Sequence, residues 1–556
     1  VDFLLRPKAY PHPTGPIGHR ETHVSHVFLA GLFAYKLKKA VTFPFLDTST
    51  LAQRLRFCRL ELSLNRRLAP SIYLGLVPVV ETPQGLRLGG MGRVIEWLVK
   101  MRRLPEDRML DQVLVRGRVS RRDLVRVADR LIPFFQRAAR NAAIDRVGRP
   151  DRVRELVLGN LQECAPFVGS LCSSENARFL EAAYRQYLTL YEPLLRQRVR
   201  QRRIIDGHGD LRCENICMTE PVTIFDCVEF QPAFRCGDMA NDLSFLVMDL
   251  EFRDRPELAA TVVARYRQRI NDQTIAAVLP FYQCHRTLVR GKVRGFAWRQ
   301  HPNTPEGRRV LALSRRHFQL ARRYARAFAP PRLIVVGGLI GTGKSTLAQS
   351  LAEALGAVWL RTDEIRLREF AHKFRGAKFI EMRSKQTTAR KPAEPQPCPE
   401  DPQIPERPSG FADGLYAPRV STLVYQRLIQ RAGALLRQGS SVICDGTFSN
   451  ASGRAALRDM ARRLGASFHF FECVVPKAVA LRRVAQRYAA QSDLSEARPE
   501  HYDHLKRGFE PVRGWPPRDW TRLSDNRSAG ETFQAALRAL RKAWGVLVSP
   551  RALRAP

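Results

Sequence analysis

One segment constrains the fold of this chain more than any other: residues 338–345, which read GLIGTGKS. They fit the pattern G-x-x-x-x-G-K-[ST] at every fixed position. A short apolar run at 333–336 precedes them, and a helical pattern over 345–355 follows. A strand, a glycine loop and a helix in this order direct backbone N–H groups and a helix N-terminus at phosphate groups. We therefore predict a P-loop NTPase fold of the α/β class, with a doubly wound parallel sheet.

The loop supplies residues of three kinds for holding a nucleotide. Its glycines let the backbone turn towards the phosphates, the Lys344 ammonium bridges the outer phosphates, and the Ser345 hydroxyl ligates Mg²⁺. Lysine is scarce along this chain, and none occurs between Lys100 and Lys292, so a lysine at the loop position stands out. The expected nucleotide contacts are Gly338, Gly341, Thr342, Gly343, Lys344, Ser345 and Thr346.

Two carboxylates are expected beside this loop. The next strand ends near residue 361, and Asp363 follows it, where a carboxylate can accept the proton of an attacking hydroxyl. The alternative for Asp363 is a helix N-cap. Asp445 ends the apolar run 442–445, which is the form of a Walker B acid that supports Mg²⁺. Arg366 is expected to contact the substrate or a phosphate.

A predicted helix at 477–490 carries arginines with near one-turn spacing. Arg483 and Arg487 are expected to clamp the triphosphate from a lid. Since Arg-rich faces are common along this chain, a solvated helix face is an equally open interpretation.

In combination, GLIGTGKST, TDEIR and VICDGTF followed by Arg454 resemble the small-molecule and zeta-toxin-like P-loop kinases over about 333–510. The resemblance implies transfer of a phosphoryl group from ATP to the hydroxyl of a small molecule. Residues 384–413 are rich in Pro, Glu, Gln and Arg and depart from the compact family form. We expect them to form a disordered insertion on the acceptor side.

A second signature lies far upstream, at residues 208–215, which read HGDLRCEN. Its spacing is that of a kinase catalytic loop, with Asp210 as the base and Asn215 as a metal ligand. Asp226, one predicted hairpin later, is the expected second metal-binding residue. Taken alone, the signature also fits a turn with ordinary caps.

Upstream of that loop, Lys36 lies in a predicted strand that reads AYK. A lysine in this position pairs with phosphate and with a glutamate of the following helix, for which Glu61 is the natural candidate. Lys38 shares the strand face and is the alternative to Lys36.

These residues resemble the aminoglycoside- and choline-kinase-like phosphotransferases. The stretches YKLKK (35–39), FDCVEF (225–230) and RTLVRGKV (286–293) are closer still to bacterial proteins that fuse such a domain to a P-loop kinase of the AAA-family ATPase type. The resemblance spans nearly the whole chain and implies an α+β, protein-kinase-like fold for the N-terminal part. Two features depart from it: no glycine-rich loop precedes Lys36, and Arg212 stands where histidine is common.

The chain of 556 residues is too long for one core, and Pro330-Pro331 marks a hinge. We predict a kinase-fold domain at 1–328, a P-loop domain at 331–525 and a basic helical tail at 526–556. No apolar run is long enough for a membrane span, so a cytoplasmic location is expected. The eleven cysteines show no zinc spacing and are expected to be buried thiols.

The formal net charge of +39 raises the question of nucleic acid. The basic residues are spread along the chain without a nucleic-acid-binding motif, so this partner is not expected. We predict an ATP- and Mg²⁺-dependent phosphotransferase with an alcohol acceptor and two kinase-like domains. The alternative gives the N-terminal domain a regulatory, nucleotide- or ligand-binding role, and a lesser alternative is a nucleic-acid-associated ATPase.

Overall fold

The computed structural model describes residues 1–43, 46–370, 414–490, 498–524 and 527–546, which form two compact units. The first unit comprises Val1–Leu180 and Glu192–Phe328, and the second comprises Glu181–Tyr191 and Ala329–Ala552. The first unit ends at Phe328, shortly before Pro330-Pro331, and the assignment of Glu181–Tyr191 to the second unit was not predicted. The insertion expected at 384–413 lies outside the described residues.

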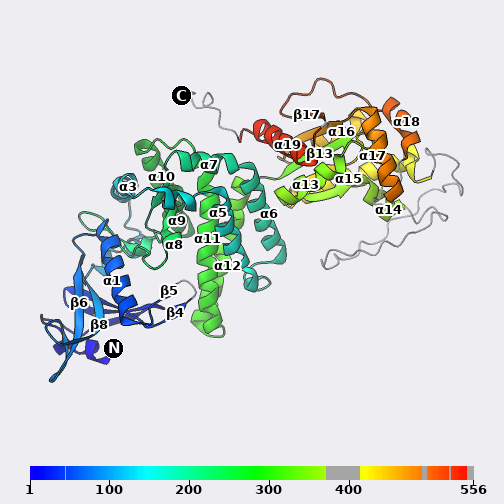
Figure 1. Ribbon diagram of the computed structural model, residues 1–556. Helices are drawn as coiled ribbons and strands as arrows, with labels where there is room; N and C mark the ends of the chain where they lie inside the picture. Colours follow the sequence, from blue (N-terminus) through cyan, green and yellow to red (C-terminus); the bar gives the residue numbers. More distant parts are fainter. Residues whose placement is uncertain (44–45, 371–413, 491–497, 525–526, 547–556) are drawn as a thin grey trace. The chain divides into compact units, whose positions relative to one another are not determined.

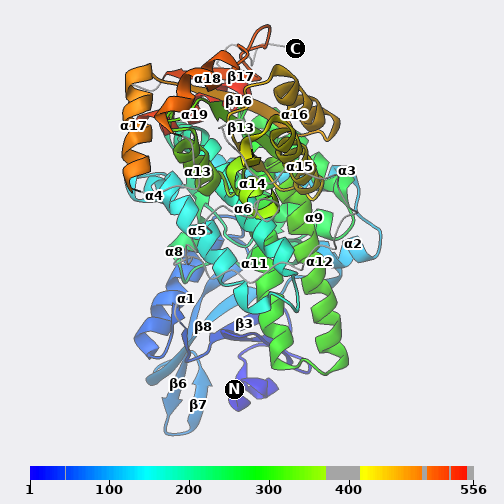
Figure 2. The same cartoon turned by 90° about the vertical axis from the view of Figure 1, so that its right-hand side faces the viewer.

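The first unit begins with a six-stranded antiparallel sheet of order β1-β2-β3-β8-β6-β7. A capping box between Thr50 and Gln53 starts helix α1 (Leu51–Arg66), which packs against β6 and β8 (Figure 2). The strands are β1 (Gly18–Glu21), β2 (Ser25–Ala30), β3 (Phe33–Lys38), β6 (Tyr73–Thr82), β7 (Gly85–Leu88) and β8 (Arg93–Arg102), with the short pair β4 (Thr42–Phe43) and β5 (Leu46–Asp47).

The rest of the first unit is helical (Figure 1). Its longest helices, α11 (Ile275–Gln300) and α12 (Pro305–Phe328), pack against each other, and α9 (Met239–Phe252) packs against α11. The other helices are α2 (Leu110–Val115), α3 (Arg121–Arg137), α4 (Ala142–Val147), α5 (Pro150–Gln162), α6 (Ser174–Leu190), α7 (Glu192–Arg200), α8 (Pro232–Arg235) and α10 (Pro256–Arg269).

Short strands carry the upstream signature between these helices. Strand β9 (Ile204–Asp206) precedes residues 208–215, and the hairpin β10 (Ile216–Cys217) and β11 (Thr223–Ile224) follows them. Strand β12 (Cys236–Asp238) pairs with β9. An antiparallel sheet with one flanking helix, followed by a helical lobe that holds this loop, is the α+β arrangement of the protein-kinase-like fold.

The second unit contains a five-stranded parallel sheet of order β14-β15-β13-β16-β17. Crossover helices connect its strands, as parallel pairing requires. The strands are β13 (Arg332–Gly338), β14 (Val358–Arg361), β15 (Val442–Asp445), β16 (Ser467–Val474) and β17 (Trp520–Ser524). The helices are α13 (Lys344–Leu355), α14 (Thr362–Phe370), α15 (Pro418–Arg437), α16 (Ala451–Arg463), α17 (Lys477–Ala490), α18 (Tyr502–Arg507) and α19 (Ala529–Ala543).

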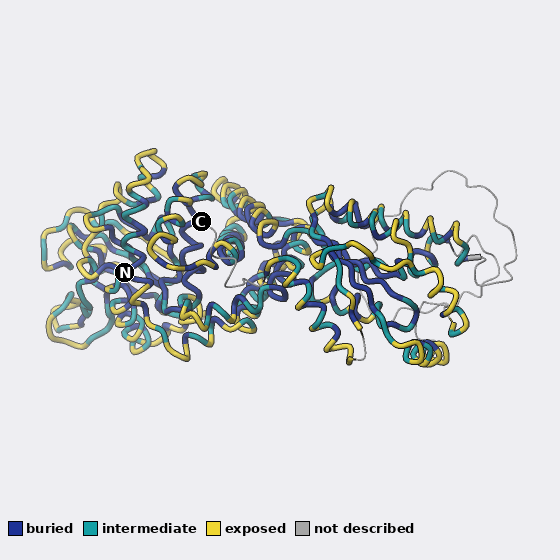
Figure 3. The backbone as a smooth tube through the Cα atoms, turned by 90° about the horizontal axis from the view of Figure 1, so that it is seen from above, coloured by how far each residue is buried: buried dark blue, intermediate teal, exposed yellow. Residues whose placement is uncertain are grey.

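Successive residues of β13 point to opposite faces of the sheet and enter two different cores. Leu333 and Val335 pack with side chains of α15 and α16, whereas Ile334 and Val336 pack with side chains of α13 and α19. The central strands are accordingly buried on both faces, and the outer sides of the helices are exposed (Figure 3). This is a doubly wound P-loop fold.

The C-terminal helix differs from the prediction of a separate tail. Leu537 and Leu540 of α19 are buried in the core that covers one face of the parallel sheet. A capping box between Ser528 and Glu531 starts this helix. Strand β17, just before it, was not predicted.

Two further features concern the described residues as a whole. No helix among them is long and apolar enough to cross a membrane. The ten cysteines in the described ranges are free thiols, and all are buried, as expected.

Candidate functional site

The glycine loop of the second unit adopts backbone conformations that favour glycine. The φ angles are +144° at Gly338, +75° at Gly341 and +80° at Gly343. A Cβ atom at Gly341 would lie 2.4 Å from the carbonyl oxygen of Ala480, so this residue also permits a close backbone approach. The Thr342 hydroxyl closes the loop by donating to the carbonyl of Leu339 at 2.8 Å. The loop therefore has a defined shape that ends at the N-terminus of α13.

Asp445 lies beside the first residues of α13. It ends β15, in register with Val336 of β13 and Arg361 of β14, so it stands at the carboxyl edge of the parallel sheet. The Lys344 ammonium and the Ser345 hydroxyl both lie close enough to lower the pKa of its carboxylate. The structure thus brings together these three residues, which the sequence analysis had selected.

Burial dominates the electrostatics of Asp445, which is 3% exposed. Burial raises the pKa of Asp445 above its usual value, although Lys344 and the hydrogen bond from Ser345 act in the opposite direction. Its Oδ1 atom has no hydrogen-bond partner in the described part of the chain. A buried carboxylate oxygen without a partner, next to a hydroxyl, is a donor set that suits Mg²⁺. Ser345 and Asp445 would hold such an ion.

Asp363 lies in the first turn of α14, directly after β14. Its charge acts on both Asp445 and Tyr425, so the three side chains share one electrostatic environment. Asp363 is half-buried, unlike Asp445. β15 alone separates β14 from β13 in the sheet, so a half-buried carboxylate after β14 can meet a small molecule that approaches the glycine loop.

Helix α17 packs against the glycine loop through Ala480 and Val484, which share a small core with Ile340. Arg483 and Arg487 on this helix are half-buried. The structure therefore attaches the arginine-bearing helix next to the loop, and the clamping role of Arg483 and Arg487 stays a prediction. Thr346 is exposed in the first turn of α13.

Two arginines of the second unit, Arg366 and Arg454, contact backbone carbonyls of other segments. Arg366 is buried, donates to the carbonyl of Leu415 and lies 4.7 Å from the ring centre of Tyr416. Arg454 is 1% exposed and donates to backbone carbonyls, among them that of Glu510 at 2.7 Å. Both guanidinium groups hold separate segments together, and a substrate or phosphate contact at Arg366 stays a prediction.

In the first unit, two lysines of β3 share one buried glutamate. Lys36 Nζ lies 2.8 Å from Glu61 Oε1 and 2.8 Å from Asp226 Oδ1. Lys38 Nζ lies 2.7 Å from Glu61 Oε2 and 2.6 Å from Glu229 Oε1. Burial lowers the pKa of Lys36, but its two acidic partners outweigh this and raise the pKa well above its usual value. Both lysines are therefore charged. The sequence offered Lys36 and Lys38 as alternative partners of Glu61, and in the structure both of them pair with it.

Backbone contacts from α9 hold the loop at residues 208–215. Asp242 accepts hydrogen bonds from the backbone N–H groups of His208 at 2.7 Å and Gly209 at 2.9 Å. Asp249 accepts one from the backbone N–H of Cys213 at 3.0 Å. The sequence analysis missed both aspartates. Their signal is that they are acidic residues within the otherwise mostly apolar helix α9.

Asp210, the expected base, is bound by an arginine two residues away. Arg212 Nε donates to Asp210 Oδ1 at 2.8 Å, and Arg212 Nη2 donates to Oδ2 at 2.9 Å. Asn215 Nδ2 adds a third hydrogen bond to Oδ2 at 3.0 Å. Burial raises the pKa of Asp210, but the pairing with Arg212 outweighs it and leaves the pKa below its usual value. The carboxylate is ionised but is engaged by Arg212.

Asn215 and Asp226 lie on either side of the β10–β11 hairpin, and the N–H of Phe225 donates to the carbonyl of Asn215 at 3.0 Å. The amide oxygen of Asn215 and the second carboxylate oxygen of Asp226 are oxygen donors of the kind that Mg²⁺ takes. No group of three or more His, Cys, Asp or Glu residues suited to a metal occurs among the described residues.

The fold and these two sites define a protein that joins a protein-kinase-like unit to a P-loop unit. Residues 333–512 match the family model described as AAA domain. The chain is 33% identical to the uncharacterized proteins Rv2004c of Mycobacterium tuberculosis (strain ATCC 25618 / H37Rv) and Mb2027c of Mycobacterium bovis over 490 residues, which is 88% of this chain and 90% of each relative. The chain belongs to the family of these mycobacterial proteins.

Two solved structures give weaker matches to this chain. A sugar kinase from Janibacter sp. HTCC2649 is 19% identical, covers 40% of this chain and 100% of its own, and has a TM-score of 0.26. A choline/ethanolamine kinase family protein from Mesorhizobium loti is 15% identical, covers 58% of this chain and 98% of its own, and has a TM-score of 0.35. Both TM-scores are low, so neither likeness supports a conclusion about function.

Proposed function

We propose that this protein is an ATP- and Mg²⁺-dependent phosphotransferase whose second unit transfers a phosphoryl group to the hydroxyl of a small molecule. The observation that carries the proposal is the position of Asp445 at the carboxyl edge of the parallel sheet, where its carboxylate interacts with Ser345 and Lys344 at the N-terminus of α13. This combination binds nucleotide phosphates and a divalent cation in P-loop proteins.

In the proposed reaction, the loop N–H groups and Lys344 bind the β- and γ-phosphates of ATP. Asp363 accepts the proton of the acceptor hydroxyl. A bond forms between the acceptor oxygen and the γ-phosphorus, the bond from that phosphorus to the β–γ bridging oxygen breaks, and ADP leaves. Bound Mg²⁺ supplies neutralisation of the phosphate charge, and Ser345 and Asp445 hold it.

The first unit is proposed as a second kinase-fold domain, with Lys36 and Glu61 on the nucleotide side and Asp210 as its base. The regulatory alternative has a specific observation in its favour. Arg212 makes two hydrogen bonds to the carboxylate of Asp210 and must release it before Asp210 can accept a proton. A domain in this state can bind a nucleotide without transferring phosphate.

The experiment uses the full chain and four variants: Lys344→Ala, Asp210→Asn, the double variant and Lys542→Ala. Lys542 is exposed on α19 and serves as a matched control for the loss of one lysine. Turnover of γ-labelled ATP is followed in the presence of a fractionated small-molecule extract. We expect Lys344→Ala to lower turnover by about 100- to 1,000-fold. Adding Asp210→Asn should remove the remaining activity, and Lys542→Ala should match the parent.

Acid stability of the labelled product tests the acceptor class, because phosphate esters of alcohols survive acid treatment that destroys acyl phosphates and phosphoramidates. If Lys344→Ala keeps most of the turnover and Asp210→Asn removes it, the active unit is the first one and the proposal for the second is wrong. If Asp210→Asn changes nothing in either background, the regulatory alternative for the first unit stands. Salt-dependent binding to DNA or RNA would support the nucleic-acid alternative instead.

A further inference from the structure

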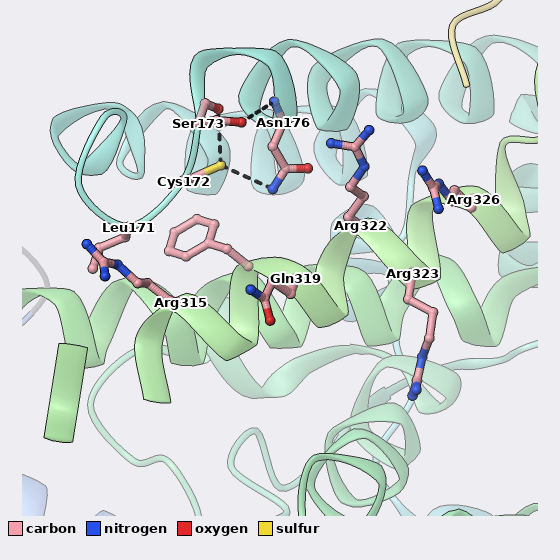
Figure 4. Close-up of a pocket in the computed structure, with 10 residues that line it drawn as sticks. Leu171, Cys172, Ser173, Asn176, Arg315, Gln319, Arg322, Arg323 and Arg326 are labelled. Atoms are coloured by element: carbon pink, nitrogen blue, oxygen red, sulfur yellow. Dashed lines mark hydrogen bonds between the residues drawn. The ribbon is translucent and has the colours of Figure 1, made fainter. Parts of the chain in front are cut away.

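The first unit contains a cavity that is separate from the lysines and aspartates described above. It lies between the residues that lead into α6 and one face of α12, and its volume is about 620 Å³ (Figure 4). This volume is within the range of pockets that hold small molecules. No acidic residue lines it, whereas four arginines do: Arg315, Arg322, Arg323 and Arg326.

The arginines form part of a stripe along α12. Arg315, Arg322 and Arg326 are separated by seven and four residues, so they lie on the same face of the helix. Arginines one helical turn apart, such as Arg322 and Arg326, repel each other. The stripe therefore concentrates positive charge along one wall of the cavity, and a bound anion would relieve the repulsion.

Three of the four arginines already contact other groups of the protein. Arg315 Nε donates to the carbonyl of Ser170 at 2.9 Å, and Arg323 Nη2 pairs with Glu251 at 3.1 Å. In Figure 4 the side chain of Arg323 points away from α6, whereas Arg322 and Arg326 reach towards it. Arg322 has one ion pair, with the exposed Glu175 at 3.1 Å. Arg322 and Arg326 are the cations best placed for a ligand.

The opposite wall offers a group of a different kind. Asn176 is 8% exposed and its Nδ2 donates to the Cys172 sulfur at 3.3 Å. Its Oδ1 is buried and accepts no hydrogen bond from any described residue. Because Asn176 lines the cavity and this oxygen is an acceptor without a partner, it calls for a ligand that donates a hydrogen bond, such as a hydroxyl group. The ligand must therefore combine negative charge with a donor.

The N-terminus of α6 adds to the attraction for an anion. Ser173 precedes this 17-residue helix, and its hydroxyl accepts a hydrogen bond from the backbone N–H of Asn176 at 3.1 Å. The positive end of the helix dipole thus faces the same cavity as Arg322 and Arg326.

We propose that the α6–α12 cavity binds a small phosphorylated compound that also carries hydroxyl groups, of the sugar-phosphate class. The phosphate lies between the guanidinium groups of Arg322 and Arg326, whose planar forks match its oxygens. A hydroxyl of the same molecule donates to Asn176 Oδ1. The site is independent of the proposed phosphoryl transfer, because none of its residues belongs to either nucleotide site.

The test is isothermal titration calorimetry of the full chain in saturating AMP-PNP and Mg²⁺, so that both nucleotide sites are filled and no turnover occurs. The probes are ribose 5-phosphate, glucose 6-phosphate and glycerol 3-phosphate, with ribose and inorganic phosphate as comparisons. We expect at least one of the three phosphorylated probes to bind saturably, and free ribose not to bind.

Variants locate the binding. Arg322→Gln/Arg326→Gln should weaken binding of that probe at least tenfold, while Arg308→Gln/Arg309→Gln, exposed on the same helix, should leave it unchanged. Asn176→Ala should weaken the phosphorylated probe several-fold and leave inorganic phosphate unaffected. Circular dichroism checks that each variant is folded, and Arg322→Lys/Arg326→Lys, which keeps the charge, should bind with intermediate affinity.

Several results would overturn the proposal. One is the lack of saturable binding by all three phosphorylated probes. Another is an equal loss of affinity in the Arg308/Arg309 control, since that indicates a general charge effect. If inorganic phosphate binds as tightly as the sugar phosphates and Asn176→Ala has no effect, the cavity is only an anion site and the hydroxyl contact is wrong.

Discussion

Replacing Asp445 by asparagine should have opposite effects on stability and on activity. The carboxylate is buried, its Oδ1 lacks a hydrogen bond among the described residues, and burial raises its pKa. A carboxyl group with a raised pKa binds more protons in the folded chain than in the unfolded chain. Stability therefore falls as the pH rises above the ordinary value of 3.8, and at neutral pH the cost of the buried charge is fully present.

Asparagine has the same shape but no charge to bury. Burying a charged group costs more than burying a neutral polar one, so we expect Asp445→Asn to recover about 1 kcal/mol at pH 7 in the absence of metal. For a unit of this size, that corresponds to a rise in Tm of about 2–4 °C. Below pH 3.8 the gain should vanish, because Asp445 is then protonated in both states.

The same substitution removes a proposed support for Mg²⁺ and should lower ATP turnover by at least about 100-fold, equivalent to about 3 kcal/mol. Differential scanning calorimetry in EDTA measures the change in Tm. The unfolding transition of the second unit is identified as the one whose midpoint temperature rises on addition of ATP and Mg²⁺ in the parent but not in Lys344→Ala. Turnover is measured in an Asp210→Asn background, so that only the second unit contributes.

Asp363→Asn is the matched control, because Asp363 is half-buried and its substitution should lower turnover without raising Tm. A decrease in Tm for Asp445→Asn in EDTA would contradict the electrostatic reasoning. Turnover within threefold of the parent would contradict the metal-supporting role.

Three further substitutions test other parts of the molecule. Arg198→Met removes a fully buried guanidinium that pairs with two buried carboxylates, and should destabilise the first unit by about 3–5 kcal/mol in urea unfolding. Arg212→Gln leaves burial as the dominant influence on Asp210, raises its pKa, and should move the acid limb of Asp210-dependent turnover to higher pH in a Lys344→Ala background. Gly341→Ala places a Cβ 2.4 Å from a backbone oxygen of α17 at a φ of +75°, and should weaken AMP-PNP binding in calorimetry by at least tenfold.

The second unit was the more predictable part, because its signals are local. The glycine pattern, the apolar run before it and the helical pattern after it fixed β13, the loop and α13. Asp445 could be placed beside Ser345 from sequence, because the carboxyl ends of neighbouring parallel strands meet at one edge of the sheet.

Contacts between segments far apart in the chain could not be predicted from local sequence patterns. Asp242 and Asp249 stand out as acidic residues in the mostly apolar sequence of α9, but that sequence does not show that their partner is the backbone of the loop at 208–215. The pairing of Arg212 with Asp210 depends on side-chain geometry, and Arg212 was visible only as a departure from the related phosphotransferases. The burial of Arg366 likewise depends on contacts to Leu415, which is remote in sequence.

The composition of the second unit has a consequence for how this protein can be divided. Its residues Glu181–Tyr191 come from the last turns of α6, and they are tied in by Gln186 to Ser441 at 2.6 Å and by Thr189 to the carbonyl of Ala354 at 2.6 Å. Leu190 completes one of its cores. A fragment cut at the Pro330-Pro331 hinge therefore lacks a piece of its own interior. A protein truncated at this hinge should aggregate. A chimaera that exchanges the second unit between relatives must take residues 181–191 from the same relative as that unit.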